Sequence, residues 1–435
     1  MTSHATKGPL AGIRVLGFGS FIAGPFAGQI LADFGADVIK VEPIEGEPWR
    51  YQGPFMPGES RAFLPLNRGV RSVCLNLRMP AAKEALARLV KSADAVVSNH
   101  RTDTAAKLKI DYESLSAINP RLVYVEITGY GPKGPKSEEA GFDLIMQGFA
   151  GAIASEGKVS SGHGSVLGAG QPDPVWSSSY IDFSTAYAAA SAVMAGLIGR
   201  SRTGQGQKAS TSLLINALNM QSMRVNTVGG FPSPAQKWFH ERLPKLRLAG
   251  ASYEEIQAEY QQVVRARIYR TYYRGYRTKD GGLALGTLAM PARKRLIDYL
   301  GVHDPRVDQP GYDDTTPEAA AHADRTAAEF ERIFATRTTE DWVRELRARD
   351  IPCEPVRFVE EMADDEQAKA NGYIVDVEHA SGFKWRGAGP IVQFSGGQPE
   401  ARSSPATGQH TREALADVGY SAAAVDELIR SGAAR

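Results

Sequence analysis

The sequence contains little cysteine, and its histidines form no metal-binding pattern. Cys74 and Cys353 are its only cysteines. Two cysteines are too few for a disulfide framework or a thiolate zinc site, and such sparing use is typical of a reducing compartment. The eight histidines do not fall at the spacing of metal ligands. We therefore expect no bound metal, no redox cofactor and a cytoplasmic location.

The sequence also lacks a net charge and a membrane-spanning run. Lysine and arginine number 50 against 49 aspartates and glutamates, which gives a net charge of +1. This balance argues against a protein that coats nucleic acid or binds an acidic membrane. The longest apolar stretch, residues 185–199, is short for a bilayer span, and the first ten residues lack the apolar core of a signal peptide. We expect a soluble protein that is not secreted.

Strand-like and helix-like runs alternate through the first half of the chain. Short strand-like runs predict strands at residues 13–16, 36–42, 72–77, 95–98 and 122–127, and the tight turn at residues 202–207 leads into a further strand at 208–213. Helix-like runs predict helices at residues 28–34, 81–91, 112–118 and 183–198. This alternation predicts an α/β fold in which helices cover a Rossmann-like parallel sheet.

The length of 435 residues is enough for about two domains. We expect a large α/β domain over residues 1–220, a linker and helical connection over 221–264, and a smaller α/β domain over 265–355. A return linker and a C-terminal segment over 356–435 should pack on the large domain. In this second half we expect strands near residues 283–288, 374–377 and 390–394, and helices near 318–334 and 339–349, before a final helix pair.

A glycine pair follows the first expected strand. Gly17 and Gly19, with Glu42 at the end of the second strand, resemble the dinucleotide-binding fingerprint. That fingerprint needs a third glycine three residues after Gly19, where this sequence has Ile22, and the next glycine, Gly24, precedes a proline. The pattern therefore predicts a tight turn between strand and helix, and it disfavours an NAD-dependent dehydrogenase.

Several ordered blocks resemble one enzyme family. They are residues 10–16 (LAGIRVL), 23–25 (AGP), 31–42 (LADFGADVIKVE), 67–72 (NRGVRS), 127–131 (ITGYG), 141–147 (GFDLIMQ), 202–207 (RTGQGQ), 351–356 (IPCEPV) and 408–411 (GQHT). Together they strongly resemble the class III CoA-transferases, which include formyl-CoA transferase, carnitine CoA-transferases and, as a divergent branch, α-methylacyl-CoA racemases. The resemblance runs in order from about residue 10 to residue 429.

The resemblance implies that Asp182 is the catalytic nucleophile. The family nucleophile is an aspartate at the start of the alanine-rich helix before the RTGxGQ turn, and Asp182 matches it. A carboxylate near a helix N-terminus is stabilised by the helix dipole and by unpaired backbone N–H groups, so it should be ionised at neutral pH. A purely structural N-cap is the alternative. Asp173, between two prolines in an expected loop, is the second candidate but lies outside the matched blocks.

Phe142 separates the two branches of the family. The racemases have a histidine at this position, which works with the aspartate to move the α-proton of an acyl-CoA. Phenylalanine cannot transfer a proton, so the sequence favours a transferase over a racemase. The next residue, Asp143, either assists in the substrate pocket or holds the turn.

The resemblance also places coenzyme A on the large domain, at the strand ends where an open α/β sheet favours ligands. Asn99 and His100 match positions near the pantetheine and nucleotide, Phe142 belongs to the same site, and Arg71 and Lys107 match positions near the phosphates. Lys107 replaces a family arginine, so it keeps the charge but loses the bidentate geometry. Each of these residues taken alone is more often a solvated surface residue.

Two departures bear on the acyl group. Ser20 and Ile22 stand where formyl-CoA transferase has polar side chains near the small acyl group. The tetraglycine loop of that enzyme has no counterpart in residues 264–269 (VRARIY). Both differences argue against formyl or oxalyl substrates and favour a larger acyl group.

Arginines and tyrosines interleave between residues 267 and 277. They are Arg267, Tyr269, Arg270, Tyr272, Tyr273, Arg274, Tyr276 and Arg277. This pattern is typical of a nucleic-acid stacking surface, but it also suits a strand whose arginines pair with carboxylates. The near-zero net charge favours the second interpretation. A third, intermediate interpretation is that these residues bind an anionic substrate or a CoA phosphate.

The expected activity is transfer of CoA from an acyl-CoA to a free carboxylic acid. By resemblance, Asp182 attacks the thioester to give an acyl-aspartyl anhydride, which the CoA thiolate converts into an aspartyl-CoA thioester. No cofactor is bound permanently, because CoA is part of the substrate. The family further implies an interlocked homodimer. The alternatives are an acyl-CoA racemase, an NAD-dependent dehydrogenase and a non-catalytic CoA-binding protein.

Overall fold

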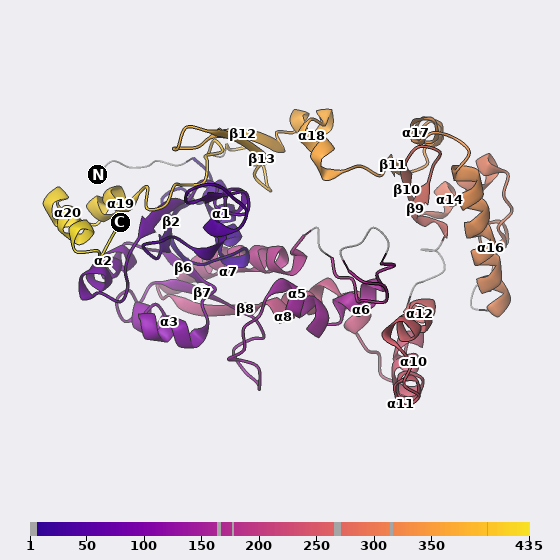
Figure 1. Cartoon of the computed structure of the whole chain (residues 1–435), viewed down its shortest axis with the longest axis horizontal. Coiled ribbons are helices and arrows are strands. Elements are labelled where there is room, and N and C mark those ends of the chain that lie inside the picture. Colours follow the sequence, from indigo (N-terminus) through magenta and orange to yellow (C-terminus); the bar gives the residue numbers. More distant parts are fainter. Residues whose placement is uncertain (1–6, 163–166, 176–177, 265–270, 314–315, 398) are drawn as a thin grey trace. The chain divides into compact units, whose positions relative to one another are not determined.

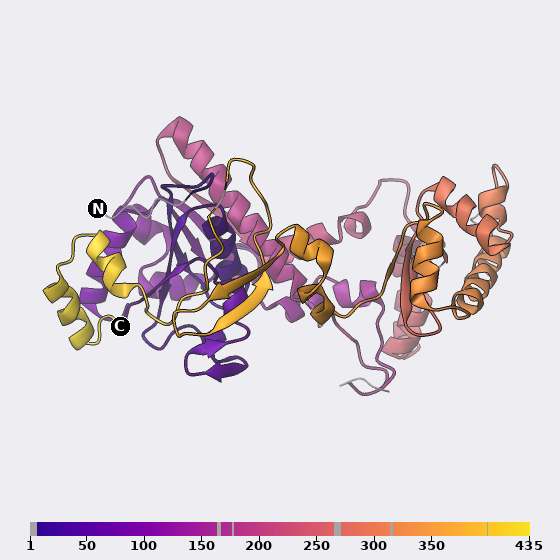
Figure 2. The ribbon, with the colours of Figure 1, turned by 90° about the horizontal axis from the view of Figure 1, so that it is seen from above.

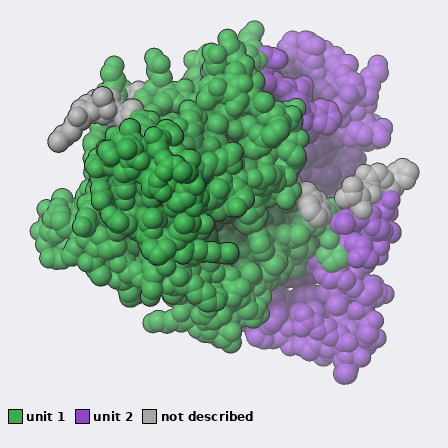
Figure 3. Space-filling view, turned by 60° about the vertical axis from the view of Figure 1, so that its left-hand side comes forward, with its two compact units in different colours: residues 1–158, 172–226, 366–435 green, residues 159–171, 227–365 purple. Residues whose placement is uncertain are grey.

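A computed structural model describes residues 7–162, 167–175, 178–264, 271–313, 316–397 and 399–435. The chain forms two compact units (Figures 1 and 3). Unit 1 comprises Met1–Lys158, Pro172–Asn226 and Glu366–Arg435, and unit 2 comprises Val159–Gln171 and Thr227–Asp365. Residues 159–171 therefore leave the expected large domain and join unit 2. The expected helical connection, from residue 227, and residues 356–365 also belong to unit 2.

Unit 1 is built on a six-stranded sheet in the order β5-β2-β1-β6-β7-β8. Its strands are β1 (Arg14–Phe18), β2 (Asp37–Glu42), β5 (Arg71–Cys74), β6 (Ala95–Ser98), β7 (Val123–Thr128) and β8 (Gln207–Ser212). Every neighbouring pair is parallel. The predicted parallel sheet is confirmed.

Helices cover both faces of this sheet, so successive strand residues enter different cores. Val15 and Val97 pack with α1 (Ala23–Asp33), α7 (Tyr180–Thr203) and α8 (Leu213–Met220). Leu16 and Val96 pack with residues of α2 (Pro80–Lys91), α4 (Tyr112–Ser116), α19 (Thr411–Asp417) and α20 (Ala422–Arg430). Burial on both faces explains why these strands are continuous apolar runs.

Helix α7 is the one described helix that is long and apolar enough to cross a membrane by length and composition. In the fold it packs against α1, β7 and α8. Its buried side chains, among them Ile181, Ala186 and Val193, belong to the core of unit 1. These contacts are those of a core helix in a globular unit.

The C-terminal segment completes unit 1 along the free edge of β5. The N–H of His410 donates to the carbonyl of Ser72 at 2.9 Å, and the N–H of Cys74 donates to Oγ1 of Thr411 at 3.1 Å. Farther along, the N–H of Arg435 donates to the carbonyl of Cys74 at 3.3 Å. In Figure 2 the yellow helices α19 and α20 accordingly lie beside the indigo and violet part of unit 1. The segment thus covers an edge that would otherwise be open to pairing.

A two-stranded hairpin comes before this C-terminal segment in the sequence. It pairs β12 (Ile374–Glu378) with β13 (Lys384–Ala388). The strand expected at residues 390–394 is wrong, because the described chain is irregular there. Pro390 has no N–H to donate to a ladder, and pairing ends before it.

Unit 2 contains a three-stranded antiparallel sheet in the order β11-β10-β9. The strands are β9 (Tyr273–Arg277), β10 (Gly282–Gly286) and β11 (Cys353–Pro355), and the main helices are α14 (Met290–Leu300), α16 (Pro317–Phe334) and α17 (Thr339–Arg347). Tyr272 and Tyr276 are buried with Phe330, and Arg274 pairs with Glu331 at 2.9 Å. These contacts favour the structural interpretation of the arginine–tyrosine series. Arg267, Tyr269 and Arg270 lie outside the described residues.

Further elements complete the two units. In unit 1 they are η1 (Pro48–Tyr51), β3 (Pro54–Met56), β4 (Glu59–Ser60), η2 (Leu64–Leu66), α3 (Thr102–Leu108), α5 (Asp143–Phe149), α6 (Ala152–Glu156), α9 (Ser222–Val225) and α18 (Glu366–Ala370). In unit 2 they are α10 (Pro234–Glu241), α11 (Leu243–Leu248), α12 (Tyr253–Val264), α15 (Pro305–Asp308) and η3 (Val359–Ala363).

Candidate active site

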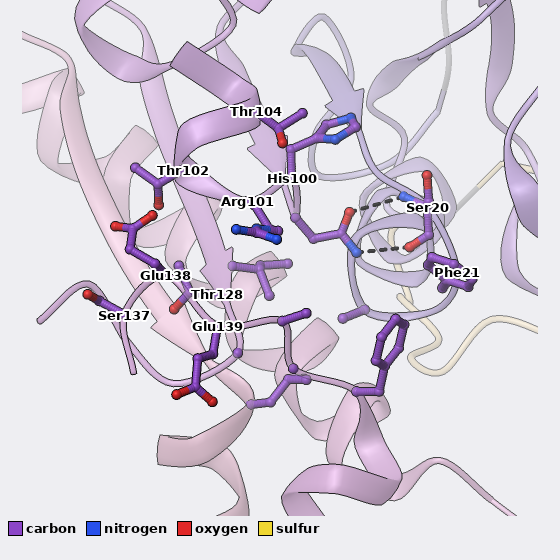
Figure 4. A pocket seen from close by; sticks show the side chains of 18 of the residues that line it. Ser20, Phe21, His100, Arg101, Thr102, Thr104, Thr128, Ser137, Glu138 and Glu139 are labelled. Carbon is purple, nitrogen blue, oxygen red and sulfur yellow. Dashed lines mark hydrogen bonds between the residues drawn. The ribbon is translucent and has the colours of Figure 1, made fainter. Parts of the chain in front are cut away.

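A cavity of about 300 Å³ lies in unit 1 where several strands end (Figure 4). Its lining includes Ser20 after β1, Asn99 and His100 after β6, Thr128 at the end of β7, and Leu213 after β8. Carboxyl ends of parallel strands are the usual ligand-binding edge of such a sheet. The cavity is also lined by residues at three helix starts, namely Ala23 of α1, Phe142 before α5 and Asp182 of α7.

The structure brings five of the predicted site residues to this cavity. They are Ser20, Asn99, His100, Phe142 and Asp182. Ile22 is buried at the N-cap of α1, and Asp143 is buried at the first turn of α5. Neither these two side chains nor Asp173 line the cavity.

The two predicted phosphate-binding residues lie elsewhere. Arg71 starts β5, where its guanidinium pairs with Asp37 at 3.1 Å and Asp417 at 2.9 Å. This is the amino end of the strand, opposite the edge that holds the cavity. Lys107 lies on α3, is largely exposed, and pairs with Asp103 at 3.3 Å. Arg71 therefore forms ion pairs within the fold. Both Arg71 and Lys107 remain only predicted CoA ligands.

Asp182 stands in the first turn of α7, in a half-buried position. Burial raises the pKa of its carboxyl to about 7, and the nearby charge of Asp143 adds to this effect. The expected stabilisation by free helix N–H groups is absent, because the N–H groups of Ile181 and Asp182 donate to Oδ2 of Asp143 at 2.8 and 3.1 Å. Asp182 is thus partly protonated near neutral pH, which corrects the sequence-based expectation.

Asn99 holds the loop between β1 and α1. Its side-chain oxygen accepts the N–H of Ser20 at 3.0 Å, and its amide donates to the carbonyl of Ser20 at 2.8 Å, as Figure 4 shows with dashed lines. A β-carbon on Gly19 or Gly24 would come within 3.2 Å of its side chain. Gly19 and Gly24 therefore let the strand-to-helix turn close around Asn99, whereas a β-carbon on Gly17, the other glycine of the G-x-G pattern, would meet no atom closer than 4.0 Å.

The next residue of this loop, Phe21, has a left-handed backbone with φ of 66°, an unusual conformation for an aromatic residue. Its N–H donates to Glu47 at 2.8 Å, and Lys40 pairs with Glu47 at 2.8 Å and donates to the carbonyl of Gly19 at 2.8 Å. These contacts of Lys40 and Glu47 with the loop were not predicted, because no local sequence pattern connects the residues involved.

Aromatic rings form one wall of the cavity. The Phe21 ring packs edge-on against Phe142, with centroids 5.7 Å apart, and against Trp49 at 5.3 Å. Phe21 and Phe142 both line the cavity. This wall offers apolar contact and no group that could carry a proton.

A second cavity adjoins the first at His100. It measures about 480 Å³ and is lined by residues after β2 and β5, including Pro43, Asn76 and Arg78. His100 lines both cavities. Burial and then the charge of Lys40 lower its pKa, which keeps the imidazole neutral at physiological pH. Arg78 was not predicted, although it directly follows an expected strand.

Polar residues complete the first cavity. Arg101, Thr102, Thr104, Glu138 and Glu139 contribute to its lining (Figure 4). Across the described residues, no group of three histidine, cysteine, aspartate or glutamate side chains is placed to hold a metal ion. The titratable side chains that line this cavity are His100, Arg101, Glu138, Glu139 and Asp182.

Comparison with known sequences identifies the family. The model of CoA-transferase family III matches residues 10–411. The succinate–glutarate CoA-transferase of Agrobacterium fabrum is 32% identical, with 95% of this chain and 96% of that protein covered. A formyl-CoA:oxalate CoA-transferase of Rhodopseudomonas palustris is 30% identical, with 98% and 97% covered.

Solved structures share the fold. A CAIB/BAIF family protein from Brucella suis superposes with a TM-score of 0.70 at 27% identity, covering 94% of this chain and 99% of that one. The Mycobacterium tuberculosis protein Rv3272 gives a TM-score of 0.71 at 24% identity, over 93% and 99% of the two chains. The match over residues 10–411 and the relative at 32% identity show that the chain belongs to CoA-transferase family III and is an enzyme of that class.

Proposed function

We propose that this enzyme moves CoA from an acyl-CoA thioester to a free carboxylic acid, with Asp182 as the nucleophile. The observation that carries the proposal is that Asp182 lines one cavity and that His100 lines both this cavity and a second one. Two neighbouring cavities beside a reacting carboxylate suit a long thioester substrate. The family membership supplies the reaction class.

Four exchanges between carboxylate and thiolate complete the reaction. An oxygen of Asp182 attacks the thioester carbonyl, the C–S bond breaks, and CoA leaves as thiolate from an acyl-aspartyl anhydride. The thiolate attacks the aspartyl carbonyl and expels the donor acid as carboxylate, which leaves an aspartyl-CoA thioester. The acceptor carboxylate then attacks this thioester, and the released thiolate takes the acceptor acyl group and frees Asp182. No proton is gained or lost, so no general acid or base is required.

The surroundings of Asp182 suit these steps. A carboxylate that is partly desolvated, as the pKa near 7 indicates, attacks more readily than a fully hydrated one once it is ionised. Oxyanions that form at the reacting carbonyls need hydrogen-bond donors. Helix α1 has no side-chain cap at its start, and Ala23 of its first turn lines the cavity. We propose that the first N–H groups of α1 are these donors.

We propose that CoA extends across His100. The nucleotide end would occupy the second cavity, where Arg78 is the cationic side chain of the lining, and the pantetheine would pass the neutral His100 to reach Asp182. A neutral imidazole can contact the uncharged pantetheine without the cost of burying a charge. Asn99 then acts on the substrate through the Ser20 loop that it holds.

For the acids, we propose short carboxylic acids, since the relatives are named for succinate, glutarate, formyl and oxalate groups. The apolar wall of Phe21 and Phe142 favours acyl groups larger than formyl. A screen of succinyl-CoA, glutaryl-CoA and formyl-CoA as donors against succinate, glutarate and oxalate as acceptors would identify the pair. We also propose, from the family resemblance, a cytoplasmic and interlocked homodimer, which light scattering and a subunit-exchange assay would check.

Trapping with hydroxylamine tests the nucleophile. Wild-type protein incubated with its acyl-CoA and hydroxylamine should carry a hydroxamate on the peptide that contains Asp182, detected by mass spectrometry. Asp182→Asn should abolish both the adduct and CoA transfer, whereas Asp173→Asn, the matched control, should keep both. If Asp182→Asn retains transfer within about tenfold of wild type, a barrier change of only about 1.4 kcal/mol, Asp182 is not the nucleophile.

Isotope exchange separates transfer from racemisation. In deuterated buffer, a chiral 2-methylacyl-CoA should gain no deuterium at its α-carbon, because Phe142 cannot carry the second proton. Rapid α-deuteration that Asp182→Asn abolishes would replace the transferase proposal with the racemase alternative.

A further inference from the structure

A buried glutamine in α5 links two parts of the chain next to Asp182. Gln147 is only 2% exposed. Its side-chain oxygen accepts the N–H of Val175 at 3.0 Å, and its amide donates to the carbonyl of Val175 at 3.2 Å. The same amide donates to Oδ1 of Asp143 at 2.6 Å. Gln147 thus uses both ends of its side chain to hold the backbone of Val175.

Asp143 continues this connection to the nucleophile. It is 7% exposed and lies one helical turn before Gln147 on α5. Its second oxygen, Oδ2, accepts the N–H groups of Ile181 and Asp182. Because α7 has no side-chain cap from its own N-cap residue, Ser179, a residue of another helix supplies the cap.

These contacts form one continuous relay. It runs from the Val175 backbone through Gln147 and Asp143 to the backbone of Asp182. The three donors that reach Asp143 are the amide of Gln147 and the backbone N–H groups of Ile181 and Asp182. The relay therefore holds the Asp143 carboxylate beside the start of α7.

Other charged groups line the cavity or lie on elements that pack against α7. Those that line the cavity are Arg101, Glu138 and Glu139, with His100 as the titratable neutral group. Among elements that pack against α7, β7 and β8 bring Glu126 and Lys208, which pair at 3.1 Å, and α1 brings Asp33, which pairs with Arg68. On α7 itself Tyr180 is the nearest titratable neighbour in sequence, and burial raises the pKa of its hydroxyl. Asp143 is the charge that acts on Asp182 besides burial itself.

We propose that Gln147 and Asp143 are positioning residues for CoA transfer: through them, helix α5 fixes the place of Asp182 and the charge that it experiences. The inference rests on the proposed function, in which Asp182 is the nucleophile. It goes beyond that function by assigning a positioning role to two residues that do not line the cavity. Because a shift of about 1 Å in a reacting group can cost on the order of 100-fold in rate, the relay has a direct effect on transfer.

Two single variants separate the charge of this relay from its hydrogen bonds. Asp143→Asn keeps an acceptor oxygen for the N–H groups of α7 but removes the charge, so the pKa of Asp182 should fall. Gln147→Glu brings a second carboxyl group to within hydrogen-bond distance of Asp143, and two such groups share one proton. The charge beside α7 is then kept, so the pKa of Asp182 should stay close to that of wild type, while the hydrogen bond to the Val175 carbonyl is lost.

A double variant keeps the proposal testable if a single one folds poorly. Asn at position 143 presents its amide to the amide of Gln147, and two donors cannot bond. Asp143→Asn combined with Gln147→Glu restores a donor–acceptor pair and moves the charge one turn away from α7. We expect the double variant to recover at least part of the kcat lost by Asp143→Asn, while keeping a lowered pKa at Asp182.

The experiment follows Asp182 directly and then its activity. ¹³C NMR of protein labelled at aspartate side chains, with Asp182→Asn as the assignment control, gives the pKa of Asp182 without any substrate. The pH profile of kcat/KM gives the same quantity in transfer. Asp111→Asn is the matched control, because Asp111 also caps a helix, α4, away from the cavity; it should leave both readouts unchanged.

The outcomes distinguish this inference from the proposed function. A lowered pKa of Asp182 in Asp143→Asn, a nearly unchanged pKa in Gln147→Glu, and a kcat lowered about 10- to 100-fold in Asp143→Asn with KM for acyl-CoA nearly unchanged support the relay. An unchanged pKa of Asp182 in Asp143→Asn would overturn it even in a fully active enzyme. A lowered pKa in Asp143→Asn, in a protein for which Asp182→Asn leaves transfer intact, would keep the electrostatic link, refute the nucleophile and thereby refute a positioning role in transfer.

Discussion

Gly129 and Gly141 meet backbone to backbone beside the candidate active site. A β-carbon added to Gly141 would lie 2.5 Å from the α-carbon of Gly129, and one added to Gly129 would lie 2.8 Å from the α-carbon of Gly141. Gly129 follows β7, and Gly141 precedes Phe142 and Asp143 at the start of α5. The contact therefore sets how closely α5 approaches the sheet, and with it the place of the aromatic wall and the relay.

Replacing Gly141 should damage both stability and activity. In Gly141→Ala, the new methyl group meets backbone atoms that cannot rotate away, so we expect a loss of about 1–3 kcal/mol in unfolding free energy. Displacement of Phe142 and Asp143 should also lower kcat. Chemical denaturation and steady-state kinetics measure both effects. Gly396→Ala is the control, since a β-carbon added there would meet no atom of the described residues within 4 Å; equal effects of the two substitutions would contradict the argument.

Asp182 should lower the stability of the fold at alkaline pH. Its pKa is about 7 in the fold against an ordinary value of 3.8, so between these values the folded state binds more protons than the unfolded state. Stability then falls as pH rises across this window, by roughly 1.4 kcal/mol for each unit of pKa shift. We expect Asp182→Asn to be more stable than wild type at pH 8, with the difference vanishing toward about pH 4. Thermal melts at a series of pH values test this, and a pH-independent difference would disprove it.

A buried ion pair should prove essential for folding of unit 1. Arg50 and Glu42 are 0% and 2% exposed, and two parallel hydrogen bonds of 2.8 and 2.9 Å join them. Arg50→Ala leaves Glu42 buried without its partner, and we expect a loss of about 3–5 kcal/mol. The exposed pair of Arg88 and Glu84, also at 2.9 Å, is the control, and Arg88→Ala should cost less than about 1 kcal/mol. Similar losses in both variants would contradict this burial argument.

Arg78 and Lys107 should differ in their effect on acyl-CoA binding. Arg78 lines the second cavity, whereas Lys107 is 76% exposed and pairs with Asp103. Arg78→Ala should raise KM for acyl-CoA more than it lowers kcat, because a remote phosphate contact is made equally in the ground and transition states. Lys107→Ala should change KM less. The reverse order of effects would return the phosphate site to Lys107, as the family resemblance implies.

The central strands of the sheet could be predicted from the sequence because both of their faces are buried. Strands such as β1 and β6 are continuous apolar runs, and a run of this kind is visible without knowledge of its neighbours. The end of β8 is harder to place, because this strand is polar and largely exposed. The expected strand extends to Leu213, but Ser212 accepts the N–H of Ile215 and caps α8 directly. A single capping residue thus decides where the strand ends.

The ionisation of Asp182 could not be predicted, because it depends on a residue far away in sequence. The helix start alone suggests free N–H groups and an ionised carboxylate. In the fold, Asp143 accepts those N–H groups from a different helix, so the donors stabilise its charge and not that of Asp182. Gln147 and Arg78 were missed for a related reason, since their roles arise from tertiary neighbours and not from a local pattern.

The C-terminal segment along β5 has a consequence for synthesis of the chain. On the side of β5 that faces away from β2, backbone groups of Ser72 and Cys74 bond to His410, Thr411 and Arg435. A ribosome adds residues at about 5–20 per second, so this sheet edge stays open for on the order of half a minute after β5 has emerged. During that interval the nascent chain presents an unpaired parallel strand to its neighbours on the polysome, where a chaperone that shields strand edges would improve its yield.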